Sequence, residues 1–153
     1  MIYSLIVFDL DFTLWDTGGL WCDCTTPPYF FKNGKLFDAN YRHLKLYPDT
    51  IEILEELSNE GHILAVASRT SRPEWAKKLM HLFNIDRFFK YKEIYPTTKI
   101  KHLNKISRDS GHTLDHLIFF DDEYRNIEDA RSIGVQAVYV KNGINKSLIA
   151  HCK

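Results

Sequence analysis

Cysteine is scarce in this sequence of 153 residues, which contains only Cys22 and Cys24 in the stretch "CDC" and Cys152 near the end. Three cysteines are a poor basis for a disulfide framework in a chain long enough to bury a core, so we expect a reducing, cytoplasmic environment. "CDC" could bind a metal, but two cysteines without a second pair or a histidine cluster make a poor zinc site.

Long apolar runs and net charge are also missing. No stretch approaches the ~20 apolar residues that cross a bilayer, and the N-terminus has no charged segment followed by an apolar one and a cleavage site. Lysine plus arginine and aspartate plus glutamate both number 20, which leaves no net charge to attract nucleic acid or an acidic membrane. We expect a soluble protein, a monomer, without nucleic-acid or membrane partners.

The sequence does contain an alternation of short apolar runs with longer amphipathic stretches. The runs predict strands at 3–9, 63–68, 92–96, 117–122 and 137–140. The stretches between them predict helices within 47–61, 71–83, 99–111 and 123–134. This alternation is typical of an α/β fold with a doubly wound parallel sheet, and the length fits one domain over residues 1–153.

Helix ends are marked by recognisable signals. Asp49 with Glu52, and Ser71 with Glu74, have the spacing of a capping box at a helix start. Pro73 suits a first helical turn, where its missing N–H costs little. Three glycines stand where helices are expected to end: Gly61, Gly111 and Gly134.

Residues 17–46 interrupt the alternation, because they are rich in Gly, Pro, Asn and aromatics and show no sustained period. Irregular loops or a small hairpin around "KNGK" would suit this segment, since Asn-Gly favours a two-residue turn. A long insertion directly after the first strand is more often a functional flap than a linker. Its aromatic side chains could simply be buried in the hydrophobic core. Trp15, just before the segment, is the residue that we expect to contact the flap.

Polar residues follow four of the predicted strands, where ligands of open parallel sheets bind. These residues are Asp9 and Asp11, Ser68 and Arg69, Lys99, and Asp121 and Asp122. Several carboxylates in one crevice repel one another, and a hard divalent cation, most naturally Mg²⁺, relieves that repulsion. A hydroxyl, a guanidinium and an ammonium suit phosphate oxygens. The set therefore indicates phosphoryl transfer, with one N-terminal carboxylate as nucleophile and the other as acid and base.

Each of these residues, considered in isolation, could instead have a purely structural role. An aspartate after a strand often caps a helix or shapes a turn, as could Ser68, and Arg69 could be a solvated surface charge. Lys99 could share an exposed helix face with Lys101 and Lys105.

The motifs "DLDFT", "ASRT", a downstream lysine and "FFDDE" resemble, in order, the four motifs of the haloacid dehalogenase superfamily of phosphohydrolases. The resemblance covers nearly the whole chain, from about residue 5 to residue 145. It implies that Asp9 is nucleophile and metal ligand. It further implies that Asp11 is the general acid and base, which also gives its backbone carbonyl to Mg²⁺.

The same resemblance implies that Ser68 binds the phosphoryl oxygens, that Arg69 lies in the substrate site, and that Lys99 offsets the charge of nucleophile and phosphate. Asp122 corresponds to the metal ligand, while the division of roles between Asp121 and Asp122 stays open.

The expected activity is a Mg²⁺-dependent phosphatase acting through an aspartyl-phosphate, on a fold with a small flap and no large cap domain. An insertion of this size leaves the site mostly open. Aryl phosphates, phosphotyrosine and sugar phosphates are all possible substrates, and the sequence does not choose between them. A phosphotransferase, or a phosphate-binding module without turnover, are the alternatives on the same fold.

Overall fold

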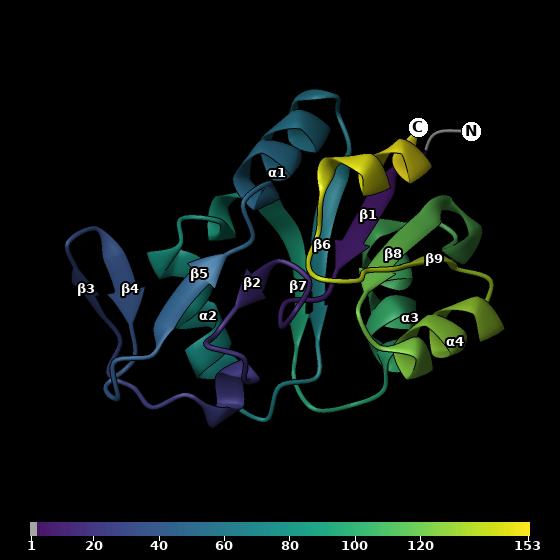
Figure 1. Ribbon diagram of the computed structural model, residues 1–153. Helices are drawn as coiled ribbons and strands as arrows, with labels where there is room; N and C mark the ends of the chain where they lie inside the picture. Colours follow the sequence, from purple (N-terminus) through teal and green to yellow (C-terminus); the bar gives the residue numbers. More distant parts are fainter. Residues whose placement is uncertain (1–2) are drawn as a thin grey trace.

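A five-stranded parallel sheet forms the centre of the computed structural model, which describes residues 3–153 (Figure 1). Its strands are β1 (Leu5–Phe8), β6 (Ile63–Ser68), β7 (Phe89–Ile94), β8 (Leu117–Asp121) and β9 (Gln136–Tyr139). Their order is β7-β6-β1-β8-β9, with every neighbouring pair parallel. The predicted doubly wound α/β class is confirmed. The order reverses beside β1, and ligands of such sheets bind at the carboxyl ends of the strands there.

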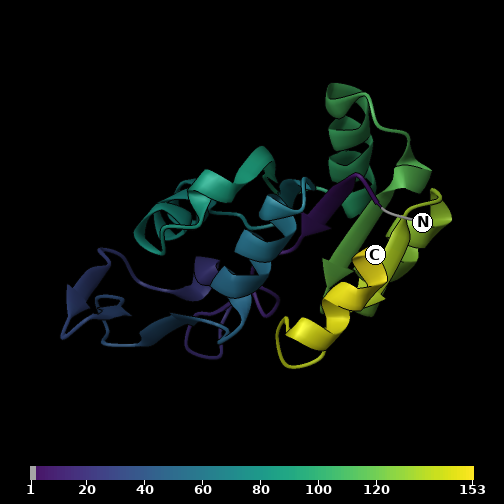
Figure 2. The same cartoon turned by 90° about the horizontal axis from the view of Figure 1, so that it is seen from above.

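Helices cover both faces of the sheet. They are α1 (Thr50–Asn59), α2 (Pro73–Leu82), α3 (Lys99–Ser110) and α4 (Tyr124–Ser132), with short 3₁₀ segments η1 (Cys22–Cys24), η2 (Asp86–Phe88), η3 (Leu114–His116) and η4 (Lys146–Cys152). Seen from above, α1 in blue and the yellow C-terminal segment lie on one side of the sheet and α3 in green on the other (Figure 2). No helix among residues 3–153 has both the length and the apolar character needed to cross a membrane.

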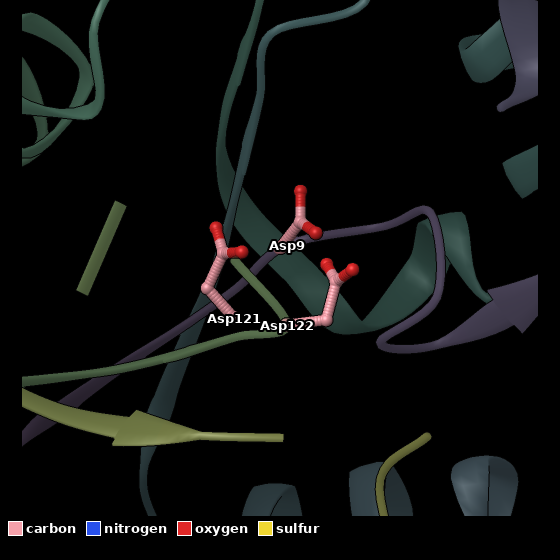
Figure 3. Close-up of side chains that lie close together, drawn as sticks. All are labelled: Asp9, Asp121 and Asp122. Atoms are coloured by element: carbon pink, nitrogen blue, oxygen red, sulfur yellow. The ribbon is translucent and has the colours of Figure 1, made fainter. Parts of the chain in front are cut away.

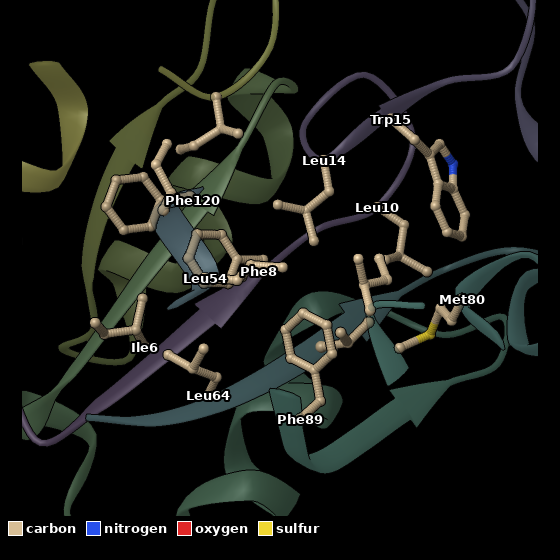
Figure 4. Close-up of a cluster of buried hydrophobic side chains, with 14 of the residues drawn as sticks. Ile6, Phe8, Leu10, Leu14, Trp15, Leu54, Leu64, Met80, Phe89 and Phe120 are labelled. Carbon is tan, nitrogen blue, oxygen red and sulfur yellow. The ribbon is translucent and has the colours of Figure 1, made fainter. Parts of the chain in front are cut away.

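The residues of β1 alternate between two cores, because successive strand side chains point to opposite faces. Ile6 and Phe8 pack in a cluster with residues of α1 and α2, among them Leu54 and Met80 (Figure 4). Leu5 and Val7 pack in the other cluster, with residues of α3 and α4. All four β1 residues are fully buried, which fixes the strand and hence the position of the residue that follows it.

The insertion is more regular than the sequence indicated. Together with β2 (Trp15–Asp16), which directly precedes it, the insertion forms an antiparallel sheet in the order β2-β5-β4-β3. Its own strands are β3 (Phe30–Lys32), β4 (Lys35–Phe37) and β5 (His43–Leu46). The predicted hairpin is present: Asn33 and Gly34 join β3 to β4, with φ of 53° and 76° as a tight two-residue turn requires. Strands of two to four residues are too short to show a period.

Both predicted capping boxes are wrong. Asp49 stands at the N-cap of α1, but its carboxylate accepts from the Lys146 backbone N–H. Arg72, and not Ser71, is the N-cap of α2, because the Ser71 hydroxyl donates to Asp23 in η1. Pro73 does begin α2, and Gly111 does end α3 in the left-handed conformation, with φ of 75°. Side chains predicted to cap helices therefore tether separate segments instead.

A buried histidine on α3 ties the helix to the loop that precedes it. The ring of His102 is fully buried, its Nε2 lies 2.9 Å from the Tyr95 carbonyl oxygen, and it packs edge-on against the Tyr95 ring. Burial, and then the nearby Lys99 charge, lower the pKa of His102 to about 4. The folded protein therefore holds this ring neutral.

This burial predicts a pH-dependent stability. The unfolded chain takes up the proton near the ordinary pKa of 6.5, whereas the folded chain resists it down to about 4. The stabilisation is complete above 6.5 and is lost as the pH falls toward 4. Between about pH 7.5 and about pH 5, the wild type should lose about 2 kcal/mol of unfolding free energy relative to His102→Gln, which keeps an N–H donor. Urea unfolding of both proteins measures this difference, and parallel pH profiles would contradict it.

Candidate active site

Asp9 lies at the carboxyl end of β1, at the bottom of the crevice where the strand order reverses. Its backbone N–H continues the sheet by donating to the Phe120 carbonyl of β8. Its Oδ1 accepts from Lys99 Nζ at 3.0 Å, and its Oδ2 accepts from the Thr13 hydroxyl at 3.3 Å. Both carboxylate oxygens are thus oriented by neighbouring side chains.

Lys99, the first residue of α3, points into the protein. Its side chain is 1 % exposed, and Nζ lies 3.2 Å from Asp121 Oδ2 and donates to the Ala67 carbonyl at 2.5 Å. On the same helix, Lys101 is exposed and Lys105 is partly exposed. The alternative that placed all three lysines on one solvated face is therefore wrong for Lys99.

Three carboxylates gather at this end of the sheet. Oxygens of Asp9, Asp121 and Asp122 lie within 4.8 Å of one another, and Figure 3 shows the three carboxylate groups side by side. Burial, and then the Asp121 charge, raise the pKa of Asp9 well above its usual value and that of Asp122 to about 6. Burial alone lowers the pKa of Lys99, but Asp9 and Asp121 raise it, so its ammonium stays charged. One ammonium against three carboxylates leaves an excess of negative charge.

Asp121 and Asp122 differ in how their oxygens are used. Asp121 is fully buried; its Oδ1 accepts from the Glu123 N–H at 2.8 Å, and its Oδ2 accepts from Asn126 Nδ2 at 3.0 Å and pairs with Lys99. Asp122 is only partly buried and lines the crevice. An ion entering from the crevice meets Asp122 first, whereas both Asp121 oxygens already have protein partners.

Asp11 faces the crevice from the side of the insertion. Its Oδ1 accepts from the Trp15 indole N–H at 2.7 Å, and the Cys22 backbone N–H lies 3.1 Å from each of its oxygens. Burial raises the pKa of Asp11 to about 6, against the opposing effect of the bonds from Trp15 and Cys22. Trp15 also pairs with Leu46 in the short sheet of the insertion. Trp15, just before the insertion, and Cys22, within it, thus fix the Asp11 carboxylate.

A cavity of about 190 Å³ lies above these groups. Six residues singled out from the sequence line it: Asp9, Asp11, Ser68, Arg69, Lys99 and Asp122. Ser68 ends β6 and is almost completely buried. Arg69 Nη1 donates to Asn126 Oδ1 at 3.2 Å, so Asn126 links Arg69 to Asp121. Four separate segments therefore contribute to one crevice.

Three contributors were not identified from the sequence. Thr13 lies in the quoted motif "DLDFT", four residues after Asp9, so its position was a usable signal. Asn126 follows Asp121 by five residues in the first turn of α4 and is buried. Cys22 acts through its backbone N–H, for which a sequence carries no signal. The thiols of "CDC" are free, and Cys24 is exposed.

Comparison with known proteins places the chain among phosphatases. Residues 1–151 match the family model described as Acid Phosphatase. The human protein named magnesium-dependent phosphatase 1 is 41% identical over 144 residues, which cover 93% of this chain and 80% of that protein. A HAD-like hydrolase superfamily protein of Schizosaccharomyces pombe is 37% identical over 155 residues, covering 92% of this chain and 88% of its own length.

A solved structure shares the fold. The HAD family enzyme of Bacteroides thetaiotaomicron, in complex with magnesium and inorganic phosphate, superposes with a TM-score of 0.69 at 13% identity. The match covers 95% of this chain and 98% of that one.

The buried position of Lys99 predicts a large effect on stability when its charge is removed. In Lys99→Met, Asp9 and Asp121 lose the cation between them, and breaking a buried pair of this kind costs about 3 kcal/mol. Lys101→Met, on the exposed face of the same helix, is the matched control and should change the unfolding free energy by less than about 0.5 kcal/mol. Urea unfolding in a chelating buffer measures both. Equal effects of the two substitutions would contradict the pairing.

Proposed function

The chain belongs to the acid phosphatase family within the haloacid dehalogenase superfamily, and from that membership we propose that it is a magnesium-dependent phosphatase acting through an aspartyl-phosphate on Asp9. The observation that carries the proposal is the placement of Asp9 and Asp11 in one crevice. Asp9 is held by Lys99 at 3.0 Å, and Asp11 is held by Trp15 at 2.7 Å. Two carboxylates with separate supports can perform separate tasks.

In the first step, a carboxylate oxygen of Asp9 attacks phosphorus and the ester P–O bond breaks. The departing oxygen takes a proton from Asp11, whose carboxyl group lies on the wall of the same cavity. The products are the free alcohol or phenol and an aspartyl-phosphate on Asp9.

In the second step, water attacks the phosphorus of the aspartyl-phosphate. Asp11, now ionised, accepts the proton of that water, and the bond between phosphorus and Asp9 breaks to release inorganic phosphate. The bonds from Trp15 and Cys22 to Asp11 keep the carboxyl group oriented in both steps. Asp9 and Asp11 thereby return to their starting protonation states.

Phosphate oxygens need donors while Asp9 attacks, because both partners carry negative charge. Ser68 and Arg69 line the cavity with a hydroxyl and a guanidinium. The positive charge of the Lys99 ammonium, 3.0 Å from Asp9 Oδ1, offsets the negative charge of Asp9. We assign these three residues to phosphoryl binding.

The donor set fits Mg²⁺, because its side chains offer only carboxylate oxygens and their charge exceeds that of Lys99. We assign the ion to the carboxylates of Asp9 and Asp122 and the backbone carbonyl of Asp11, with Asp121 orienting Lys99 and Asn126. When bound, the ion neutralises charge on the phosphoryl group. The name of the human relative and the magnesium and phosphate in the Bacteroides enzyme support this choice.

We infer aryl phosphates, phosphotyrosine side chains or sugar phosphates as substrates. The crevice is bordered by an insertion of short strands, and residues 3–153 contain no second large domain that would enclose it. An open site can admit a phosphate carried on a bulky molecule. Three free thiols are consistent with a cytoplasmic location.

The proposal predicts that turnover depends on magnesium. Hydrolysis of an aryl phosphate should fall to background after exhaustive chelation and return when Mg²⁺ is added, because Asp9 and Asp122 need a counter-charge when phosphate binds. Release of inorganic phosphate is the readout, with the alcohol acceptor varied to distinguish hydrolysis from transfer. Full activity in the chelated protein would exclude the metal, and a phosphorylated acceptor as main product would favour the phosphotransferase.

Substitution of Asp9 and substitution of Asp11 should cause different catalytic defects. Asp9→Asn should abolish the covalent phosphoenzyme, because an amide is a poor nucleophile. Asp11→Asn should still form it but release the leaving group and hydrolyse the intermediate more slowly, by about 10²–10⁴-fold for a poor leaving group. Acid-quench trapping followed by peptide mapping locates the phosphoryl group. A phosphoryl group found on Asp11 would reverse the assignment.

A further inference from the structure

The mouth of the cavity carries one exposed aromatic side chain. Trp21 is 54% exposed and lines the cavity. The other residues that line it within the described part of the chain are polar or charged, among them Asp23, Glu123 and Arg125. By contrast, Trp15 is fully buried. An indole left partly in water at the rim of a polar pocket offers a flat apolar surface to whatever enters.

The backbone beside Trp21 is held in place on both sides. Cys22, the next residue, donates its N–H to both oxygens of Asp11. Asp23 accepts from the hydroxyl and the backbone N–H of Ser71, at 2.9 and 3.4 Å, which ties η1 to the loop after β6. The Thr25 hydroxyl donates to the Cys22 carbonyl at 2.5 Å and closes the turn. Trp21 is therefore presented by an anchored turn.

The same anchoring couples the indole to the chemistry. Asp11 is the group that we assign to the leaving oxygen, and the residue next to Trp21 in the chain binds Asp11 directly. The alcohol or phenol attached to the leaving oxygen must pass the rim of the cavity on its way out, and Trp21 lies at that rim. On the α4 side of that rim Glu123 and Arg125 form a pair at 3.4 Å, so that side is polar.

We propose that Trp21 forms a leaving-group subsite, which selects phosphomonoesters whose leaving group carries a ring that can stack on the indole. This inference rests on the proposed phosphatase function and names the substrate class for the same site. Such a ring has two sources: the aromatic ring of an aryl phosphate or phosphotyrosine, and the apolar face of a sugar ring. Stacking on an aromatic side chain is the chemistry that they share.

The test compares three substrates: phenyl phosphate, a pyranose phosphate and the acyclic ester glycerol phosphate. In Trp21→Ala, the ratio of kcat/KM for the preferred ring substrate to that for glycerol phosphate should fall roughly 3- to 10-fold, as expected for one aromatic contact. Trp21→Phe, which keeps a ring, should retain most of the ratio. Tyr124→Ala removes another exposed aromatic ring that does not line the cavity, and it should leave the ratio unchanged.

A loss confined to phenyl phosphate identifies the aryl source, and a loss confined to the pyranose phosphate identifies the sugar source. An unchanged ratio for both in Trp21→Ala, or an equal fall in Tyr124→Ala, overturns the subsite.

Binding separates this outcome from failure of the phosphatase proposal. Benzylphosphonate and inorganic phosphate are titrated into the Mg²⁺-containing protein by calorimetry. If the aryl source is identified, Trp21→Ala should no longer bind benzylphosphonate more tightly than inorganic phosphate. If the sugar source is identified, a sugar phosphonate replaces benzylphosphonate in the same comparison. A protein without turnover that still shows this loss keeps the subsite and refutes the phosphatase. An active enzyme whose ligand preferences do not depend on Trp21 keeps the phosphatase proposal and refutes the subsite.

Discussion

The repulsion among three carboxylates around one buried ammonium is the constraint on which this site depends. Asp9, Asp121 and Asp122 bring their oxygens within 4.8 Å of one another, and Lys99 lies between two of them at 3.0 and 3.2 Å. In a buried setting such a group is costly unless each charge has partners. The Asn126 amide and the Glu123 N–H supply them for Asp121, and Thr13 supplies one for Asp9. The charge that remains is what a divalent cation would neutralise.

The sheet order explains why these groups can meet. β1 and β8 are parallel neighbours, so their carboxyl ends place Asp9 beside Asp121 and Asp122. β6, on the other side of β1, ends at Ser68. Lys99 reaches the crevice from the start of α3, which the turn after β7 directs toward it. The positions of Asp9, Ser68, Asp121 and Asp122 therefore follow from strand order and from where each strand ends.

Much of this was predictable from the sequence, because buried parallel strands are read as apolar runs and functional residues stand at their ends. The doubly wound class, the hairpin at Asn33 and Gly34 and four of the five core strands needed no three-dimensional information, whereas β7 begins at Phe89, three residues before the predicted strand. What could not be predicted depends on long-range contacts. The Ser71 hydroxyl is bound by Asp23 instead of capping α2, and the Cys22 N–H, which has no sequence signature, holds Asp11. Outside that hairpin, the short strands β2 and β5 were missed because their lengths fall below one readable period.

The insertion has a consequence for selectivity. Its Cys22, together with Trp15 just before it, orients Asp11, and its Trp21 offers one apolar surface at the mouth of the cavity. In the proposed mechanism, the phosphoryl group is bound by several charged residues, which contribute equally for every phosphomonoester. A single stacking contact is worth roughly 0.5–1.5 kcal/mol, enough to rank leaving groups but far too little to exclude the others. A site built in this way favours a class of substrates rather than one compound, and stricter selection would require contacts beyond the crevice.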